Sequence, residues 1–371
     1  MTNALDNLRA GMKIEYFIHR PAEWLSASGP ESDIVISTRM RLARNLRGVN
    51  FTRKATEAQR RVVLETAAAA AAATPELAGA LLVELGKIAD LDRQFLVERH
   101  LISRELSPRH QGAVIVGARE SVSVMINEED HLRLQVHQSG LCFAEALAQI
   151  DRLDDALEKH LAYEFSPVLG YLTACPTNVG TGLRASAMLH LPALVIQKQI
   201  GQIIQAFGKL GLAVRGIYGE GTQASGNMFQ ISNQVTLGKS DEEIVRDLDK
   251  IIAKVIGYER AARSALAEAR SAELEDKIYR AEGILRSARL ISSEETLELL
   301  SGLRLGVDLR FLPRISRAAV NELFLAAQPA HLQKLAGKEL SSRARDELRA
   351  RLIREKLAEE KGPARKRKRE E

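Results

Sequence analysis

The sequence predicts an α+β protein, in which an antiparallel β-sheet flanked by helices is followed by an all-helical C-terminal domain. Before residue 240, short apolar runs rich in β-branched residues recur between turn signals, and one run alternates apolar and polar residues as a half-buried strand does. After residue 240, Leu, Ile and Ala recur at spacings of three and four among many charges, which is typical of amphipathic helices. Strands first and helices afterwards indicate two structural units.

The first elements follow from local signals. Residues 1–30 contain Pro21, Gly29 and Pro30, so we expect an irregular segment that Trp24 anchors to the body. Residues 32–46, which carry several arginines, are predicted to form a strand. The alanine-rich stretch "TEAQRRVVLETAAAAAAATPELAGA" predicts a helix that stops at its proline, and "ALLVEL" a strand. "IADLDRQFLVERHLIS" is predicted to be helical. "GAVIVGA", "SVSVMIN" and "HLRLQVHQ" then predict an antiparallel meander.

The next segments alternate helices and strands. The amphipathic stretch 144–163 predicts a helix, and "GLRASAMLHLP" a strand that ends at Pro192. "ALVIQKQIGQIIQAFGKLG" predicts one helix capped by Gly211. "LAVRGIYGEG" and "NMFQISNQVTLG" predict a pair of strands, and 241–360 only helices. The expected units are an N-terminal extension (1–31), a catalytic body (32–260), a helical domain (261–360) and a basic tail (361–371).

Composition and charge exclude several classes of protein. The 371 residues contain no apolar run near the roughly 20 residues that cross a membrane, so we expect no membrane association. "MTNALDNLRAGMKIEY" has no secretory signal pattern, and two cysteines make no disulfide framework, which favours the cytoplasm. Of the net charge of +5, the last eleven residues carry +4. The charge is therefore a property of the tail, no aromatic residues are interleaved with it, and nucleic acid is not the partner we expect.

The segment "ISTRMRLARN" places Arg39 and Arg41 on one face of the predicted strand, and Met40 and Leu42 on the other. Two guanidinium groups side by side repel each other unless solvent or a dense anion lies between them. By itself the pair is compatible with a solvated strand face. Whether the pair marks a solvated strand face or an anion-binding face depends on the polar segments elsewhere in the chain.

Polar, glycine-bearing segments recur where strand ends and loops are expected. There is no Gly-x-x-x-x-Gly-Lys loop, no Gly-x-Gly-x-x-Gly turn and no Cys/His spacing for zinc. Arginine offers another anion cradle, because its fork matches phosphate oxygens and keeps its charge. A triphosphate with Mg²⁺ would balance four or five arginines, although each alone is compatible with an ordinary surface charge. The segments are "STRMR" (37–41), "NEEDHLR" (127–133), "CPTNVGTGLRAS" (175–186), "RGIYGEGTQASGN" (215–227) and His100 in "ERHLIS".

Carboxylates and a cysteine in these segments are candidates for chemistry. Glu128 and Glu129 are adjacent, so only one can point into a site, where it could accept a proton. Glu220 lies between glycines that would let its loop close over a substrate. Cys175 precedes a proline in a polar loop. A polar turn, a plain hairpin and an inert buried thiol remain the simpler interpretations of these three features.

Taken in order, these motifs resemble the guanidino (phosphagen) kinase family over residues 32–256, and within it the bacterial branch that phosphorylates arginine side chains of proteins. The resemblance implies the antiparallel sheet and helices predicted above, with ATP and Mg²⁺ as cofactors. It implies that Glu129 is the base toward the guanidinium, Glu220 its partner carboxylate, and Cys175 a neighbour of the guanidino group. The implied ATP site comprises Ser37, Thr38, Arg39, Met40, Arg41, His100, Arg133, Arg184, Ala185, Ser186, Ala187, Met188, Arg215, Gly216, Ile217, Tyr218, Gly219 and Glu220.

Departures from the family pattern refine the expectation. Small-molecule guanidino kinases carry a helical N-terminal domain, whereas about 30 residues precede "SDIVISTR" here, which favours an arginine on a protein. Tyr218 and Gln223 stand where those enzymes have a further arginine and glutamate, which leaves Glu220 as the second carboxylate. The alternatives are a kinase for a free guanidino compound, and a non-catalytic binder of phosphoarginine or nucleic acid.

The C-terminal motif "RDELRA" resembles the phosphoarginine-binding motif of the bacterial branch. Arg345 and Arg349 are four residues apart on a predicted helix, with Asp346 between them and Ala350 after them. An ordinary charged helix face is the simpler interpretation. The resemblance also implies a homodimer, a zinc-binding (McsA-like) activator, and a product that marks proteins for a Clp-type chaperone–protease.

Overall fold

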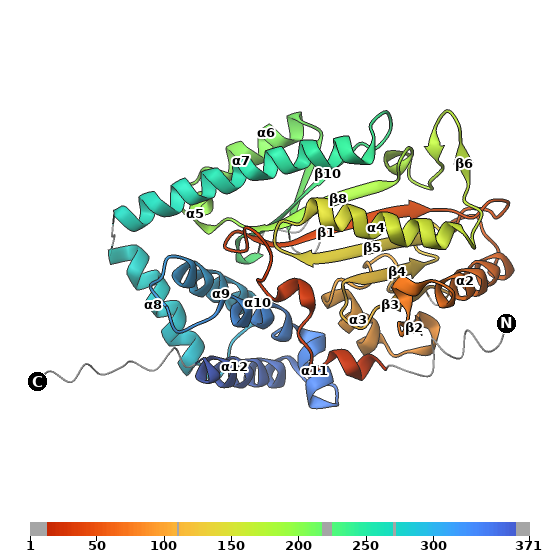
Figure 1. Ribbon diagram of the computed structural model, residues 1–371. Coiled ribbons are helices and arrows are strands. Elements are labelled where there is room, and N and C mark those ends of the chain that lie inside the picture. The colour runs from red at the N-terminus through yellow and green to blue at the C-terminus, as the bar shows by residue number, and fades with distance from the viewer. Residues whose placement is uncertain (1–12, 110, 217–224, 270–271, 361–371) are drawn as a thin grey trace, which may run out of the picture.

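The computed structural model of the protein describes residues 13–109, 111–216, 225–269 and 272–360. Within these ranges, eight strands form one antiparallel sheet in the order β2-β3-β4-β5-β1-β8-β10-β9 (Figure 1). The predicted meander is confirmed as β3-β4-β5. The strands are β1 (Val35–Arg44), β2 (Leu81–Glu84), β3 (Ala113–Val116), β4 (Val122–Ile126), β5 (Leu132–Ser139), β6 (Phe165–Ser166), β7 (Gly170–Tyr171), β8 (Leu183–His190), β9 (Leu212–Gly216) and β10 (Met228–Asn233); β6 and β7 form a separate hairpin.

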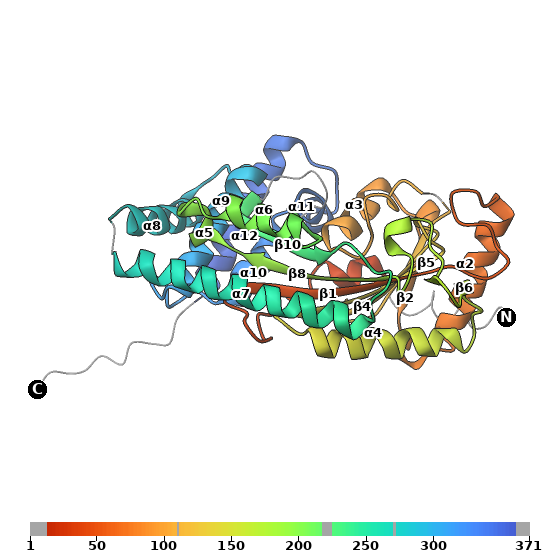
Figure 2. The same cartoon turned by 90° about the horizontal axis from the view of Figure 1, so that it is seen from above.

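Helices lie on both faces of the sheet. Helices α4 and α7 pack on one face, and the C-terminal helices lie on the other side (Figures 1 and 2). The α-helices are α2 (Glu57–Ala72), α3 (Asp90–Glu98), α4 (Phe143–Glu158), α5 (Pro192–Ile196), α6 (Ile200–Lys209), α7 (Asp241–Glu268), α8 (Ala272–Ser287), α9 (Ser293–Asp308), α10 (Arg317–Ala326), α11 (Pro329–Ala336) and α12 (Ser342–Glu359). The 3₁₀ turns are η1 (Ile14–Phe17), η2 (Glu23–Leu25), η3 (Pro75–Leu77), η4 (Leu85–Lys87), η5 (Pro176–Asn178) and η6 (Ser225–Asn227).

Side-chain caps begin many of these helices. Thr56 and Ser240 each form a capping box, with Gln59 and Glu243 as the respective partners. Single serine caps precede α9, α10 and α12. The alanine-rich segment is therefore a helix with a well-defined start, as predicted.

Two predicted helices are too long because the chain turns through the left-handed region. The segment predicted as one helix over 193–211 is two: α5 closes when Gln199 N–H donates to the Leu194 carbonyl and Lys198 adopts a φ of +58°. Helix α3 ends in the same way, with the Leu101 N–H donating to the Leu96 carbonyl and His100 at a φ of +59°. The predicted cap of the second half is confirmed, since Gly211 follows α6 at a φ of +69°.

The buried apolar side chains of the described residues form three clusters: one on the α4 and α7 side of the sheet, one in the helical domain, and one among β2, β3, β4, η1 and α3. The face that carries Met40 and Leu42 packs against α4 and α7, and both side chains are fully buried. The helical domain has its own apolar core, which also takes in Trp24 and Leu25 of η2 and Met228 of β10. Trp24 is thus buried as predicted, and it anchors the N-terminal segment at the junction of the two units.

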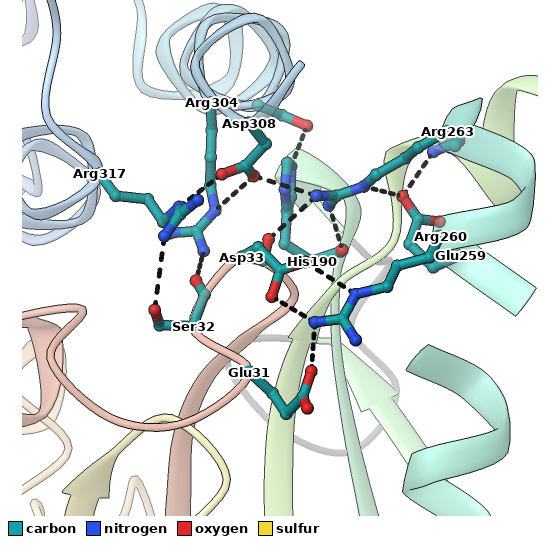
Figure 3. Close-up of polar contacts among 12 residues, drawn as sticks. Glu31, Ser32, Asp33, His190, Glu259, Arg260, Arg263, Arg304, Asp308 and Arg317 are labelled. Atoms are coloured by element: carbon teal, nitrogen blue, oxygen red, sulfur yellow. Dashed lines mark hydrogen bonds and ion pairs between the residues drawn. The ribbon is translucent and has the colours of Figure 1, made fainter. Parts of the chain in front are cut away.

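Buried ionic contacts hold the helical domain against the end of the sheet (Figure 3). Arg263 of α7 donates to Glu259 (2.7 Å), to the Asp33 carbonyl (3.0 Å) and to Asp308 of α9 (3.1 Å). Asp308 also accepts a hydrogen bond from Arg317 of α10. Helix α7 itself continues through the boundary predicted at residue 260 and ends at Glu268.

No helix of the described ranges is long and apolar enough to cross a membrane.

Candidate active site

The face of the sheet opposite α4 and α7 collects the predicted arginines. Arg41 of β1 pairs with Arg184 of β8 across the strands, and Arg39 pairs with Ser186. Arg215 of β9 stands in register with Gln230 of β10. One pocket is lined by Arg39, Arg41, Arg184, Arg215, His100, Arg104, Gln135 and Ser232, among others. The predicted sharing of a face by Arg39 and Arg41 is confirmed.

The segments 37–41 and 184–188 were predicted to belong to the ATP site as a whole, but in a strand successive side chains point to opposite faces of the sheet. Thr38 donates to the Gly140 carbonyl at 2.7 Å and is fully buried, and Met40, Ala185 and Ala187 belong to the core on the far face. Their side chains therefore point away from the pocket. Arg39 lines the arginine pocket, and Ser37, Ser186 and Met188 line a second pocket beside it.

The arginine face carries strong mutual repulsion. Burial, together with Arg184, Arg133 and Arg215, lowers the pKa of Arg39 to about 10. Burial and the charges of Arg39, Arg133 and Arg184 hold the pKa of Arg41 well below its usual value. The Nε atom of Arg41 is buried and has no hydrogen-bond partner among the residues that the structure describes. A face of this kind fits a polyanion, which would supply both the missing acceptor and the countercharge.

A more apolar pocket adjoins the arginine pocket. Arg39, His100 and Gln230 line both. Burial and the nearby Arg39 lower the pKa of His100 to about 3, so its imidazole is neutral. The closure of α3 described above therefore places a neutral imidazole at the boundary between the two pockets.

The adjacent glutamates have different surroundings, as their neighbouring positions predicted. Glu128 is buried and accepts from Ser103 (2.6 Å) and Arg133 (2.5 Å). Burial opposes its ionisation, but Arg133 and Ser103 outweigh that effect, and the pKa of Glu128 lies below its usual value. The Glu129 side chain is 46% exposed and lies 3.4 Å from Arg133; burial raises the pKa of Glu129. Glu128 thus positions Arg133, and Glu129 has the exposure and pKa direction that a base requires.

Two buried residues beside the site, Asn45 and Asp130, are not among the predicted site residues. Asp130 is fully buried and accepts from Asn45 (2.7 Å) and from the Ala174 N–H (2.7 Å), so it ties the glutamate turn to the segment that leads into Cys175. Asn45 also accepts from the His131 N–H at 2.9 Å. Asn45 lies in "RLARN" and Asp130 in "NEEDHLR", two motifs already noted. Their place in these motifs was the sequence signal that could have identified them.

Cys175 lies at the start of η5 and is half-buried, with its Sγ 3.0 Å from the Thr177 hydroxyl. Gly216 ends β9 and is buried. Ile217, Tyr218, Gly219, Glu220 and Gln223 lie outside the described residues, as does the basic tail 361–371. Within the described ranges, no group of three or more His, Cys, Asp or Glu side chains is arranged to hold a metal ion.

The C-terminal motif lies on α12. Arg349 is fully buried and donates to the carbonyls of Ala327 and Ile291, both at 2.8 Å, and pairs with Asp346. Arg345 is half-buried and donates to the Leu340 carbonyl at 2.9 Å. The two arginines therefore bond to different parts of the domain. Ala350 is buried in the domain core.

The fold and the arginine face define a phosphotransferase of guanidino groups. Residues 62–262 match the family model for the catalytic domain of ATP:guanido phosphotransferases, so the chain belongs to this family. Two solved structures resemble this chain. The match to lombricine kinase has a TM-score of 0.57 and 29% identity, and it covers 66% of this chain and 73% of the lombricine kinase chain. The duplicated taurocyamine kinase of Schistosoma mansoni with bound transition-state analogue components has a TM-score of 0.58 and 26% identity, over 63% of this chain and 34% of its own.

Within that family, the chain belongs with the protein-arginine kinases. Residues 271–368 match the model of the protein-arginine kinase McsB C-terminal domain. The protein-arginine kinase of Bacillus licheniformis is 47% identical over 349 residues, which is 93% of this chain and 96% of the relative. That of Bacillus cereus (strain ATCC 10987) is 48% identical over 340 residues, or 91% and 96%.

Proposed function

We propose that this protein transfers the γ-phosphoryl group of ATP to arginine side chains of other proteins. The observation that carries the proposal is the arginine face of the sheet, where five arginines line one pocket and the buried Nε of Arg41 has no hydrogen-bond partner among the described residues. The names of relatives nearly half identical over almost the whole chain support the choice of acceptor.

The proposed reaction assigns each group a role. The arginines hold the triphosphate in line with the acceptor, since phosphoryl transfer depends mainly on alignment and charge neutralisation. Glu129 orients the acceptor guanidinium, whose high pKa keeps it protonated in water, and takes one N–H proton. The nitrogen then bonds to the γ-phosphorus while the bond to the bridging oxygen breaks and ADP leaves. Mg²⁺, carried by the phosphates, adds charge neutralisation and typically keeps several of its waters.

Further proposals concern the second carboxylate, the second site and the partners. Glu220 is the partner carboxylate of Glu129, and Cys175 lies beside the guanidino group. Arg345, Asp346, Arg349 and Ala350 belong to a phosphoarginine pocket, which the match of the C-terminal family model supports. A homodimer, a zinc-binding activator and a Clp-type chaperone–protease that degrades the marked proteins complete the proposal. The two free cysteines fit a reducing compartment, and we place the reaction in the cytoplasm.

A small-molecule guanidino kinase is the second candidate, because the two solved neighbours are named as kinases of lombricine and taurocyamine. A transfer assay with Mg-ATP separates the two, with free L-arginine and an unstructured arginine-containing protein offered in separate reactions. Phosphorus NMR distinguishes an acid-labile N–P bond from a phosphoester. Phosphate on the protein alone supports the proposal, and phosphate on free arginine alone supports the second candidate. A protein that binds no ATP contradicts both.

A further inference from the structure

We propose that the nucleoside end of the ATP site is a composite pocket, closed by the N-terminal segment through Trp24 and by the helical domain through Phe324. The inference rests on the proposed function and deepens it. It assigns to the helical domain a direct part in nucleotide binding.

The two adjoining pockets together have the polarity of a nucleoside triphosphate. The arginine pocket suits the phosphates. The second pocket shares Arg39, His100 and Gln230 with it, and its other walls include the apolar side chains of Ile36, Met188 and Met228. A flat, weakly polar base attached to a charged chain would place its phosphates among the arginines and its base in this second pocket.

Trp24 forms one wall of the second pocket. Its indole stacks on the imidazole of His137, with ring centroids 4.4 Å apart and planes inclined by 10°. His137 in turn contacts the Ser37 hydroxyl through Nε2 at 2.9 Å. Trp24 also meets the edge of His100 at 5.5 Å between centroids. These contacts fix the orientation of the indole against the sheet without any contribution from a ligand.

Helix α10 forms the facing wall and is joined to the Trp24 segment. Phe324 and Leu325 line the pocket, and both are buried. Asn321, one turn earlier, donates to the Leu25 carbonyl at 3.0 Å and accepts a hydrogen bond from Arg304 of α9. The N-terminal segment and the helical domain therefore act as one closing element over the sheet.

Both walls lie outside residues 62–262, which match the catalytic-domain family model, and neither belongs to a strand of the sheet. The phosphate-binding arginines come from the sheet, whereas the apolar closure comes from segments before and after it. Displacing α10 should therefore weaken binding of the nucleoside and leave binding of a bare polyphosphate intact.

The test measures ATP and tripolyphosphate binding, each with Mg²⁺, by isothermal titration calorimetry on the full-length chain. The variant is Phe324→Ala, and the matched control is Phe311→Ala, a phenylalanine of the same domain that packs partly buried on its core and does not line the pocket. Phe324→Leu repeats the measurement with a smaller change of volume. Trp24 is the single tryptophan of the chain, so its fluorescence reports on the pocket wall during each titration.

We expect Phe324→Ala to weaken ATP about tenfold, through the loss of one aromatic wall, and to leave tripolyphosphate affinity unchanged. Phe324→Leu should weaken ATP binding by a smaller factor and also leave tripolyphosphate affinity unchanged. Phe311→Ala should change neither affinity. The inference is wrong if Phe324→Ala binds ATP like the wild type, or if it loses ATP and tripolyphosphate equally. If the wild-type chain binds neither ligand, the proposed function fails, and this inference fails with it.

Discussion

Arg41 and Arg184 occupy paired positions on the neighbouring strands β1 and β8, and both side chains line the same pocket. Two guanidinium groups in this arrangement repel each other in the folded protein, and burial adds to the cost of keeping Arg41 charged. Such an arrangement favours function over stability. When a polyanion lies between the two guanidinium groups, each is attracted to it, and this attraction offsets their mutual repulsion.

Replacing Arg41 with Met should therefore separate stability from binding. We expect an unchanged or raised melting temperature without nucleotide, because the like-charge repulsion is removed. We expect ATP affinity to fall by about a hundredfold, since hydrogen bonds to charged groups contribute about 1.5–3 kcal/mol each. Thermal denaturation and calorimetric titration measure the two effects. Arg47→Met, at an exposed position, is the control and should change neither. A large loss of stability in the Arg41 variant would contradict this account.

Glu129→Gln should abolish phosphoryl transfer and spare ATP binding. The amide cannot accept the guanidinium proton, and loss of a general base typically lowers the rate by about 10²–10⁴-fold. Glu128→Gln should act differently, because Glu128 holds Arg133 and Ser103 rather than the acceptor. We expect it to weaken ATP binding as well. Single-turnover rates and ATP titrations of both variants check this, and equal loss of ATP affinity in both would argue against separate roles.

Asp130→Ala should lower transfer by releasing the segment before Cys175 from the glutamate turn. Asp130→Asn keeps an oxygen that can accept from the Ala174 N–H, so it should restore part of the activity. The rate of Cys175 alkylation by iodoacetamide offers a readout besides activity, and Asp130→Ala should change it. Peptide mapping separates this rate from that of Cys142, whose thiol pKa is raised by burial. Identical alkylation rates in wild type and Asp130→Ala would contradict the proposed anchoring.

Arg260 and Arg263 lie one turn apart on α7 and differ strongly in burial (Figure 3). Replacing each in turn therefore compares an exposed ion pair with a buried one. Arg263→Ala leaves the buried Glu259 without its ion-pair partner and removes one of the cations that face Asp308, which keeps Arg317, and we expect a loss of about 3–5 kcal/mol in the free energy of unfolding. Arg260 is 48% exposed, and Arg260→Ala should cost less than about 1 kcal/mol. Urea denaturation measures both. Similar losses would show that the buried contacts do not hold the helical domain in place.

His190 should make the protein less stable in acid. Burial, with Arg304 and Arg263 nearby, holds the pKa of His190 well below its usual value of 6.5. As pH falls below about 6.5, the unfolded chain gains a proton that the folded chain does not, so the free energy of unfolding decreases by up to ~1.4 kcal/mol per pH unit.

The check is urea denaturation from pH 7.5 down to pH 5, compared between wild type and His190→Gln. The variant should have a flatter dependence on pH, because it lacks this proton. His160→Gln, at an exposed position, should retain the slope of the wild type. Parallel curves for wild type and His190→Gln would mean that other groups cause the acid sensitivity.

The sequence by itself determined the features that depend on short-range pattern. Alternation in "ISTRMRLARN" placed Arg39 and Arg41 on one face, and the β-branched runs predicted the meander correctly. The motifs were long enough to indicate the guanidino kinase family. Each of these signals lies within about ten residues, where side-chain direction follows directly from backbone geometry.

Only the tertiary structure decided the features that join distant segments. It paired Arg41 with Arg184, tied Asp130 to the segment before Cys175, and brought Trp24 and Phe324 to one pocket. It also ended α5 at Ile196, with Lys198 in the left-handed region, where the sequence pattern continues as a helix. The physical reason is that hydrogen bonds and packing between segments far apart in the sequence outweigh local preference, and no local pattern in the chain records such contacts.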